Sequence, residues 1–281
     1  MLDTMTTQEA LNSKAETLDL PAADGGSIRC VSTGTGPTLV LAHGFLLDGS
    51  AFLSIVDPLV QRGYRVVAFD QRGHGDSRDG SAGTSPAAAV SDYHTVLEHF
   101  GAEGATLVGH SMGGFLGLLF CLQHPEHMRR LRRLVLLGAN AGAVAQGSLP
   151  NRLQMPLIEA GILPKFWRVP GLGSSLMKPL FGDDPKPEWL ERTRQMLLRQ
   201  NVARTLPLMR AMNHDNHYDK LSAITVETRV LCGELDRTCP AWHSERLSRE
   251  LPNARGRWLS GIGHMLAFEA PEAIVSAITD A

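Results

Sequence analysis

The amino-acid sequence predicts an α/β fold: a mostly parallel, twisted sheet with helices on both faces and one mainly helical insertion. Short β-favouring runs alternate with helical stretches, which is the pattern of βαβ units. Two runs, residues 66–69 and 134–137, are apolar at every position, as expected of parallel strands buried on both faces. The alternation stops over residues 141–221, where eight prolines separate short helical stretches. A segment of this length is too long for a simple connection.

The order of these elements divides the chain into three parts. Strands are expected near residues 27–33, 38–42, 65–70, 105–109, 134–139, 228–232 and 256–260. Helices of the sheet region are expected near residues 50–62, 86–100, 112–124, 241–251 and 271–280. We expect the first two strands to give the sheet an antiparallel start. The expected domains are a first core part over residues 1–140 with a flexible N-terminus (about 1–16), the insertion over 141–221, and a second core part over 222–281.

Length and charge narrow the class of protein. A chain of 281 residues suits a single α/β fold that carries an insertion. The net charge of −2 gives no electrostatic case for nucleic acid or for anionic membranes. The one dense basic cluster, residues 129–133, is interpreted as a solvated connection after a helix end.

The N-terminus and the cysteines bear on the compartment. Residues 1–16 are polar and lack the apolar core of a secretory signal, and no apolar run approaches the length of a membrane span. Of the four cysteines, Cys121 falls in an apolar helical run and Cys232 in an apolar strand. Buried thiols of this kind fit a reducing compartment better than a disulfide framework. We therefore expect a cytoplasmic protein, whose oligomeric state the sequence leaves open.

A serine between a strand and a helix is the most informative feature. The five residues from Gly109 to Gly113 read Gly-His-Ser-Met-Gly, with Ser111 at their centre. A G-x-S-x-G sequence in the order strand, turn, helix indicates a nucleophile elbow. A side chain at Gly109 or Gly113 is expected to collide with the neighbouring strand and helix. The plainer alternative is a glycine-rich turn that binds an anion at a helix N-terminus.

An acid and a base follow in the order that an activated serine requires. Asp236 lies just after the expected strand at 228–232, and His264 follows the strand at 256–260. Both residues should therefore lie at the same edge of the sheet as Ser111. Alone, an aspartate in a turn or a single histidine is commonly structural. Together with the serine they predict a Ser-His-Asp triad.

Two backbone donors complete the predicted site. The strand at 38–42 leads into His43, Gly44 and Phe45. We assign the oxyanion hole to the N–H groups of Phe45 and Met112, one from this early loop and one from the residue after the nucleophile. His43 is interpreted as a residue that fixes the loop.

These segments resemble the α/β-hydrolase fold superfamily. The resemblance rests on His43-Gly44-Phe45, the loop from Asp70 to Ser77, the segment 109–114, Gly233-x-x-Asp236 and Gly263-His264, and it runs from about residue 27 to the C-terminus. The motifs look most like the branch of serine esterases, lipases and C–C bond hydrolases. The resemblance implies that the loop from Asp70 to Ser77 is structural, and that the insertion forms a cap over the active site. Relatives that carry an aspartate at the elbow differ from this chain, which has Ser111.

The expected activity is hydrolysis of a carboxylic ester of a small-to-medium apolar substrate through an acyl-enzyme. Twelve apolar residues of the insertion are candidates to line an acyl-binding cavity or to pack the cap on the core. They are Leu153, Met155, Leu157, Ile158, Ile162, Leu163, Phe166, Trp167, Leu176, Met177, Leu180 and Phe181. The mechanism needs no cofactor, and we expect no metal, since the polar run 214–219 lacks a second cluster to complete a ligand set. Thioester or C–C bond hydrolysis by the same triad, and a non-catalytic receptor on the same fold, remain alternatives.

Overall fold

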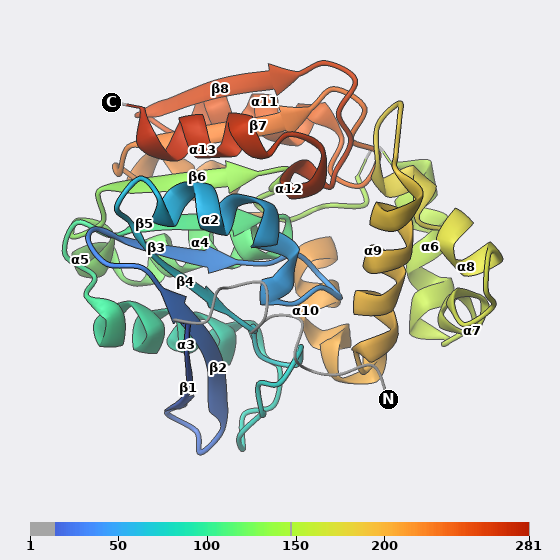
Figure 1. Ribbon diagram of the computed structural model, residues 1–281, viewed down its shortest axis with the longest axis horizontal. Coiled ribbons are helices and arrows are strands. Elements are labelled where there is room, and N and C mark those ends of the chain that lie inside the picture. The colour runs from blue at the N-terminus through green and yellow to red at the C-terminus, as the bar shows by residue number, and fades with distance from the viewer. Residues whose placement is uncertain (1–14, 147, 281) are drawn as a thin grey trace.

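One sheet organises the molecule, which the computed structural model describes over residues 15–146 and 148–280. Its strands are β1 (Glu16–Pro21), β2 (Ser27–Thr33), β3 (Thr38–Ala42), β4 (Arg65–Phe69), β5 (Thr106–His110), β6 (Arg133–Leu137), β7 (Thr228–Gly233) and β8 (Ala254–Leu259). They lie in the order β1-β2-β4-β3-β5-β6-β7-β8 (Figure 1). All neighbours from β4 to β8 pair in parallel. The predicted α/β fold with a mostly parallel sheet is therefore confirmed.

The start of the sheet differs from the expectation. The strand β1 was not predicted, and it pairs with β2 in antiparallel fashion. The expected antiparallel start of the sheet is present at β2, which is antiparallel to both β1 and β4, but the expectation is wrong for β3, which is parallel to both of its neighbours. Of the N-terminus predicted to be flexible, residues 1–14 lie outside the described residues, and Glu16 already opens β1.

Helices cover both faces of this sheet. Those that pack on it are α2 (Leu53–Val60), α3 (Pro86–Phe100), α4 (Met112–Gln123), α11 (Ala241–Glu250) and α13 (Pro271–Thr279). Alternate strand residues serve opposite layers: Val40 joins the cluster with α3, α4 and α11, whereas Leu39 and Leu41 join the cluster with α2 and α13. Figure 1 shows α2 and α13 on the near face. This period of two explains why wholly apolar strands suit the sheet.

The segment between β6 and β7 is mainly helical. It contains α6 (Leu149–Glu159), α7 (Leu163–Trp167), α8 (Leu172–Ser175), α9 (Pro187–Arg199) and α10 (Val202–His214), with the 3-10 helices η2 (Lys178–Leu180) and η3 (Tyr218–Ala223). In Figure 1, α6 to α9 lie beyond the arrowheads of the sheet, at the carboxyl ends of the parallel strands. The short elements η1 (Gly49–Phe52), α5 (Pro125–Met128) and α12 (Leu266–Glu269) complete the described fold.

The basic cluster at 129–133 is not fully solvated, which corrects the sequence interpretation. Arg133 is 1% exposed. Its guanidinium donates to the carbonyls of Ala277 (3.1 Å) and Ile278 (2.9 Å) and pairs with Glu227 at 2.9 Å. These carbonyls end α13, where a cation is favourable because the helix dipole is negative there. Arg133 therefore ties the C-terminal helix to β6.

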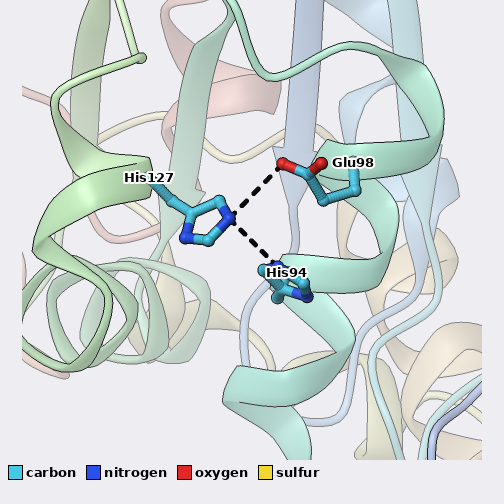
Figure 2. Close-up of side chains that lie close together, drawn as sticks. All are labelled: His94, Glu98 and His127. Atoms are coloured by element: carbon cyan, nitrogen blue, oxygen red, sulfur yellow. Dashed lines mark hydrogen bonds and ion pairs between the residues drawn. The ribbon is translucent and has the colours of Figure 1, made fainter.

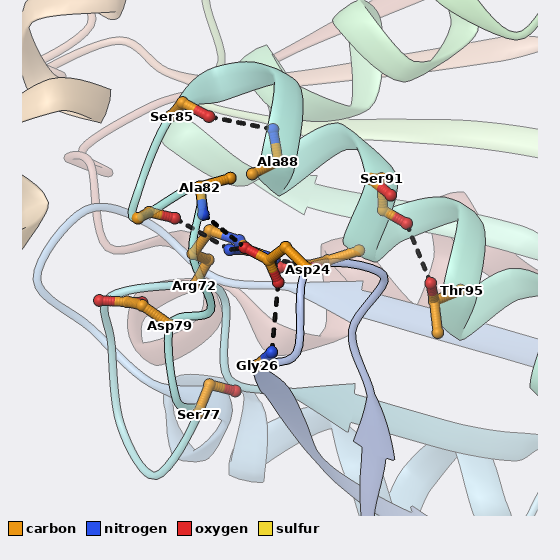
Figure 3. A network of polar contacts seen from close by, with 12 residues as sticks. Asp24, Gly26, Arg72, Ser77, Asp79, Ala82, Ser85, Ala88, Ser91 and Thr95 are labelled. Atoms are coloured by element: carbon orange, nitrogen blue, oxygen red, sulfur yellow. Dashed lines mark hydrogen bonds and ion pairs between the residues drawn. The ribbon is translucent and has the colours of Figure 1, made fainter.

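The loop after β4 fastens the antiparallel hairpin to the core. Arg72 donates to Asp24, in the turn between β1 and β2, at 2.6 Å (Figure 3). It also donates to Asp92 of α3 at 2.7 Å. The hydrogen bond from Arg72 lowers the pKa of Asp24 to about 2. Within the same loop, the Asp70 carboxylate accepts the N–H of Gly49 at 2.9 Å. These bonds fit the interpretation of the loop as structural.

Candidate active site

Ser111 occupies a strained turn between β5 and α4. Its φ of 52° and ψ of −114° lie in a region that residues with a side chain rarely adopt. Its N–H donates to the carbonyl of Leu137 in β6 at 2.9 Å, and its carbonyl accepts from Gly114 and Phe115. An ordinary serine at a helix N-terminus uses its hydroxyl to cap the helix. The Ser111 hydroxyl makes no such bond, so it is free for other chemistry.

The glycines around Ser111 are required by close packing, as the sequence predicted. A methyl group at Gly109 would lie 2.6 Å from the carbonyl oxygen of Gly113. A methyl group at Gly113 would overlap the carbonyl of Ala42, at the end of β3. The turn can therefore form only where both positions lack a side chain.

Asp236 and His264 lie together after β7 and β8. Asp236 Oδ2 is 2.7 Å from His264 Nδ1, and both residues are about 5% exposed. The other carboxylate oxygen, Oδ1, accepts the N–H groups of Thr238 (2.8 Å) and Cys239 (2.7 Å). The carboxylate is thus fixed by its own loop and accepts from Nδ1, which leaves Nε2 of His264 as the free nitrogen.

Ser111 and His264 line one cavity of about 430 Å³. No hydrogen bond joins their side chains in the described structure. The Ser111 hydroxyl instead lies within hydrogen-bond reach of the Cys239 thiol. Burial raises the pKa of that thiol far above its usual value, so Cys239 stays protonated and is a poor nucleophile. Contacts between a nucleophile and its base are often loose without substrate.

Two backbone N–H groups remain open beside Ser111. Within residues 15–146 and 148–280, those of Phe45 and Met112 have no hydrogen-bond acceptor. Met112 is the first residue of α4, where N–H groups have no partner inside the helix and the dipole favours negative charge. Phe45 precedes Leu46, whose φ of 58° marks a strained loop at the cavity wall. Phe45 lines the cavity together with Ser111, and Met112 directly follows Ser111 in the chain.

His43 fixes the loop that contains Phe45, as predicted. The residue is fully buried, its Nδ1 donates to the Gly44 carbonyl at 2.8 Å, and its Nε2 accepts the N–H of Gln71 at 2.9 Å. Burial lowers its pKa to about 4, so the ring is neutral at pH 7. Both ring nitrogens are occupied by backbone groups, which excludes His43 as a base.

Three groups that the sequence reasoning missed fix the His264 loop. His110 Nε2 donates to the His264 carbonyl at 2.9 Å, and burial lowers the pKa of His110 to about 3. The carboxylate of Glu269 accepts the N–H of Gly263 at 3.2 Å. The carbonyl of Leu180, in the helical segment, accepts the N–H of His264 at 2.8 Å. Only His110 had a local signal, its place beside Ser111.

The apolar candidates of the insertion divide into three groups. Seven line the cavity: Met155, Ile158, Leu163, Trp167, Leu176, Met177 and Leu180. Four are 40–62% exposed: Leu153, Leu157, Ile162 and Phe166. Phe181 is buried against Trp189 and Phe268 instead. Arg237, on the Asp236 loop, is the one Lys or Arg among the described residues that line the cavity.

Comparisons with known proteins agree with this geometry. A model of the alpha/beta hydrolase family matches residues 39–277. A 2-hydroxy-6-oxononadienedioate/2-hydroxy-6-oxononatrienedioate hydrolase of Paraburkholderia phymatum is 31% identical over 100% of this chain and 99% of its own. A non-heme haloperoxidase of Rhodococcus erythropolis is 29% identical over 86% of this chain and 91% of its own.

Solved structures share the same fold. An esterase from Exiguobacterium antarcticum superposes with a TM-score of 0.82 at 23% identity, over 94% of this chain and 100% of the esterase. No helix in the described part of the chain is long and apolar enough to cross a membrane. The expectation of an enzyme rather than a non-catalytic receptor is confirmed by these relatives. The chain belongs to the alpha/beta hydrolase family and is a hydrolase of that fold.

Proposed function

We propose that the protein is a serine hydrolase that cleaves a carboxylic ester of a small-to-medium apolar molecule. The observation that carries the proposal is the strained turn of Ser111 at a cavity that His264 also lines, with Asp236 held on the far side of the imidazole. The geometry supports acyl transfer, since a nucleophile, a base and an orienting acid are present in the required order.

Ser111 acts as the nucleophile and His264 as its base. Rotation of the Ser111 hydroxyl away from Cys239 brings it toward Nε2 of His264, which takes its proton as the oxygen attacks the ester carbonyl. Asp236 keeps the proton of His264 on Nδ1 and stabilises the imidazolium that forms. His264 then protonates the leaving alcohol and later activates the water that hydrolyses the acyl-enzyme. No cofactor takes part in these steps.

The N–H groups of Phe45 and Met112 stabilise the oxyanion of the tetrahedral intermediate. Their lack of an internal acceptor supports this role, because each donor is preorganised and loses no protein hydrogen bond when the oxyanion forms. Loss of one such donor typically costs about 10²–10³ in kcat.

Residues 141–221 form a cap that shapes the substrate cavity. The volume of about 430 Å³ falls within the usual range for small-molecule sites. Seven apolar side chains of this segment line it, which favours an apolar acyl or alcohol group. Because the core motifs determine the chemistry, differences in the cap determine which ester fits.

Hydrolysis of a C–C bond by the same triad is the second candidate. It is favoured by the Paraburkholderia phymatum relative, which is named as a hydrolase of an oxononadienedioate. Arg237 at the cavity offers a partner for a substrate carboxylate. Its side chain is largely exposed, however, and the rest of the lining is mostly apolar. A neutral ester fits better. Hydrolysis of a thioester by the same triad is a further alternative.

A panel of p-nitrophenyl esters tests the proposal. Wild-type protein should hydrolyse them, and Ser111→Ala should lower kcat by about 10⁴–10⁶. Ser260→Ala, at an exposed serine on the neighbouring loop, is the matched control and should keep wild-type activity. Turnover of a carboxylate-bearing C–C substrate with none of any ester would replace the ester proposal by the second candidate. Equal activity in Ser111→Ala would overturn both.

A further inference from the structure

A group of histidines and carboxylates lies at the opposite end of the nucleophile helix from Ser111. His94 and Glu98 are one turn apart on α3, and His127 lies on α5, just after α4 ends (Figure 2). A helix rises about 1.5 Å per residue, so the twelve residues of α4 separate this group from the elbow by about 18 Å. It takes no part in the chemistry described above.

We propose that His94, Glu98 and His127 bind a divalent transition-metal ion, with zinc as the best fit. One ligand atom from each of the three lies within 4.8 Å of the other two. His94 Nε2 and His127 Nε2 are 3.1 Å apart, and His127 Nε2 is 3.5 Å from Glu98 Oε1. A tetrahedral zinc ion with bonds of about 2.0–2.1 Å holds its ligand atoms about 3.3–3.4 Å apart. The observed separations bracket that value.

The tautomer of His127 points its lone pair into this group. Its Nδ1 lies 2.8 Å from the carboxylate of Glu126, to which it donates. Nε2 therefore carries the lone pair and faces both His94 and the Glu98 carboxylate. A carboxylate that orients a histidine through its other nitrogen is the arrangement found behind most histidine ligands of metals. In the structure this lone pair of His127 accepts from Nε2 of His94. Once that proton has moved away, two lone pairs and an anion face one point, which a cation satisfies.

Binding requires one rearrangement, and it balances without a redox step. The proton that His94 Nε2 shares with His127 moves to Nδ1 of His94, which has no protein partner in the described structure. Both imidazoles then remain neutral and each gives one lone pair to the metal. Two imidazoles and a carboxylate leave a fourth tetrahedral position for water. The metal would link α3 to α5.

One cation already competes for the carboxylate. Arg130 donates to Glu98 Oε1 at 2.6 Å. Its positive charge opposes the metal, so we expect moderate affinity in the native chain. Removal of this guanidinium should strengthen metal binding. That direction is opposite to what a general loss of structure at α5 would give.

The test is titration of tag-free, full-length protein with zinc chloride in a calorimeter. We expect one ion per chain, bound with moderate affinity. His94→Gln and His127→Gln should each weaken binding by at least tenfold, and Glu126→Ala by about 10–100-fold. Arg130→Gln should strengthen it. His99→Gln, at an exposed histidine of the same helix, is the matched control and should leave binding unchanged.

A second group of possible ligands shares His127 with the proposed site, and it provides the most direct test of which residues bind the metal. His124, Glu126 and His127 also converge within 4.8 Å. If His124→Gln abolishes zinc binding while His94→Gln does not, the proposed ligand set is wrong. Absence of a saturable site in wild-type protein would overturn the proposal altogether. Ser111→Ala protein should bind zinc as wild type does, so this result is independent of the proposed hydrolase chemistry.

Discussion

Replacing Asp236 by asparagine changes one atom beside the base and should disable it. Oδ1 of Asp236 accepts two backbone N–H groups of its own loop, at 2.8 and 2.7 Å. In Asp236→Asn the amide oxygen must keep these two bonds, so the amide NH₂ faces Nδ1 of His264. That nitrogen then has to accept a hydrogen bond, which moves the imidazole proton to Nε2. A histidine in this tautomer cannot take a proton from Ser111.

The size of the effect follows from the loss of that proton transfer. The wrong tautomer in a triad lowers kcat by about 10⁴, which corresponds to about 5.4 kcal/mol in the barrier. The assay is kcat for the best p-nitrophenyl ester, with the midpoint of thermal unfolding as the check on folding. Asp184→Asn, at an exposed aspartate, is the matched control and should keep full activity. A kcat of Asp236→Asn within tenfold of wild type would contradict this role of Asp236 and point to another carboxylate, with Glu269 as the first to test.

Three further predictions address the support of the triad, the cavity and the hairpin. In Gly138→Ala, the new methyl group would lie 2.9 Å from the carboxylate of Asp236, and the φ of +50° at Gly138 is one that alanine rarely adopts. We therefore expect kcat to fall by up to about 100-fold. An unchanged kcat would mean that Asp236 and His264 tolerate displacement. Ile158→Phe should move the optimum of an ester series to shorter acyl chains, since one methylene in an apolar pocket is worth about 1–3 kcal/mol, whereas Leu157→Phe, on the exposed side of the same helix, should not. The pair of Asp24 and Arg72 should contribute to stability above about pH 4, and this contribution should vanish as the pH falls toward about 2, because the folded pKa of Asp24 lies below its ordinary value. Urea unfolding should therefore show Asp24→Asn less stable than wild type at about pH 5, with the difference shrinking at about pH 3; a constant difference would contradict the pairing.

Local patterns predicted the sheet and the chemistry-bearing loops. Wholly apolar runs predicted the parallel strands because helices cover both faces of the sheet. The helices α3, α4, α11 and α13 lie within about two residues of the bounds expected from the sequence. The strand β1 was not predicted because it lies at the edge of the sheet and only one of its residues, Leu20, is buried. It forms through backbone pairing with β2, which leaves little trace in the side chains.

Contacts between distant segments were beyond the sequence reasoning. Glu269 acts on the N–H of Gly263 through a helix turn that carries no motif. The burial of Arg133 depends on the far end of α13, about 145 positions along the chain. The expectation of no metal site rested on the run 214–219. The proposed group of His94, Glu98 and His127 has no local pattern, because His127 is on another helix. Such groups become visible only once the fold brings their elements together.

The most direct test of the central claim is to map where an activated phosphonate reacts. A fluorophosphonate should label wild-type protein at one residue, peptide mass spectrometry should find the adduct on Ser111, and Ser111→Ala should abolish labelling. Prior incubation with a substrate ester should slow the reaction. An adduct on another serine, or undiminished labelling of Ser111→Ala, would contradict the assignment of Ser111 as the nucleophile.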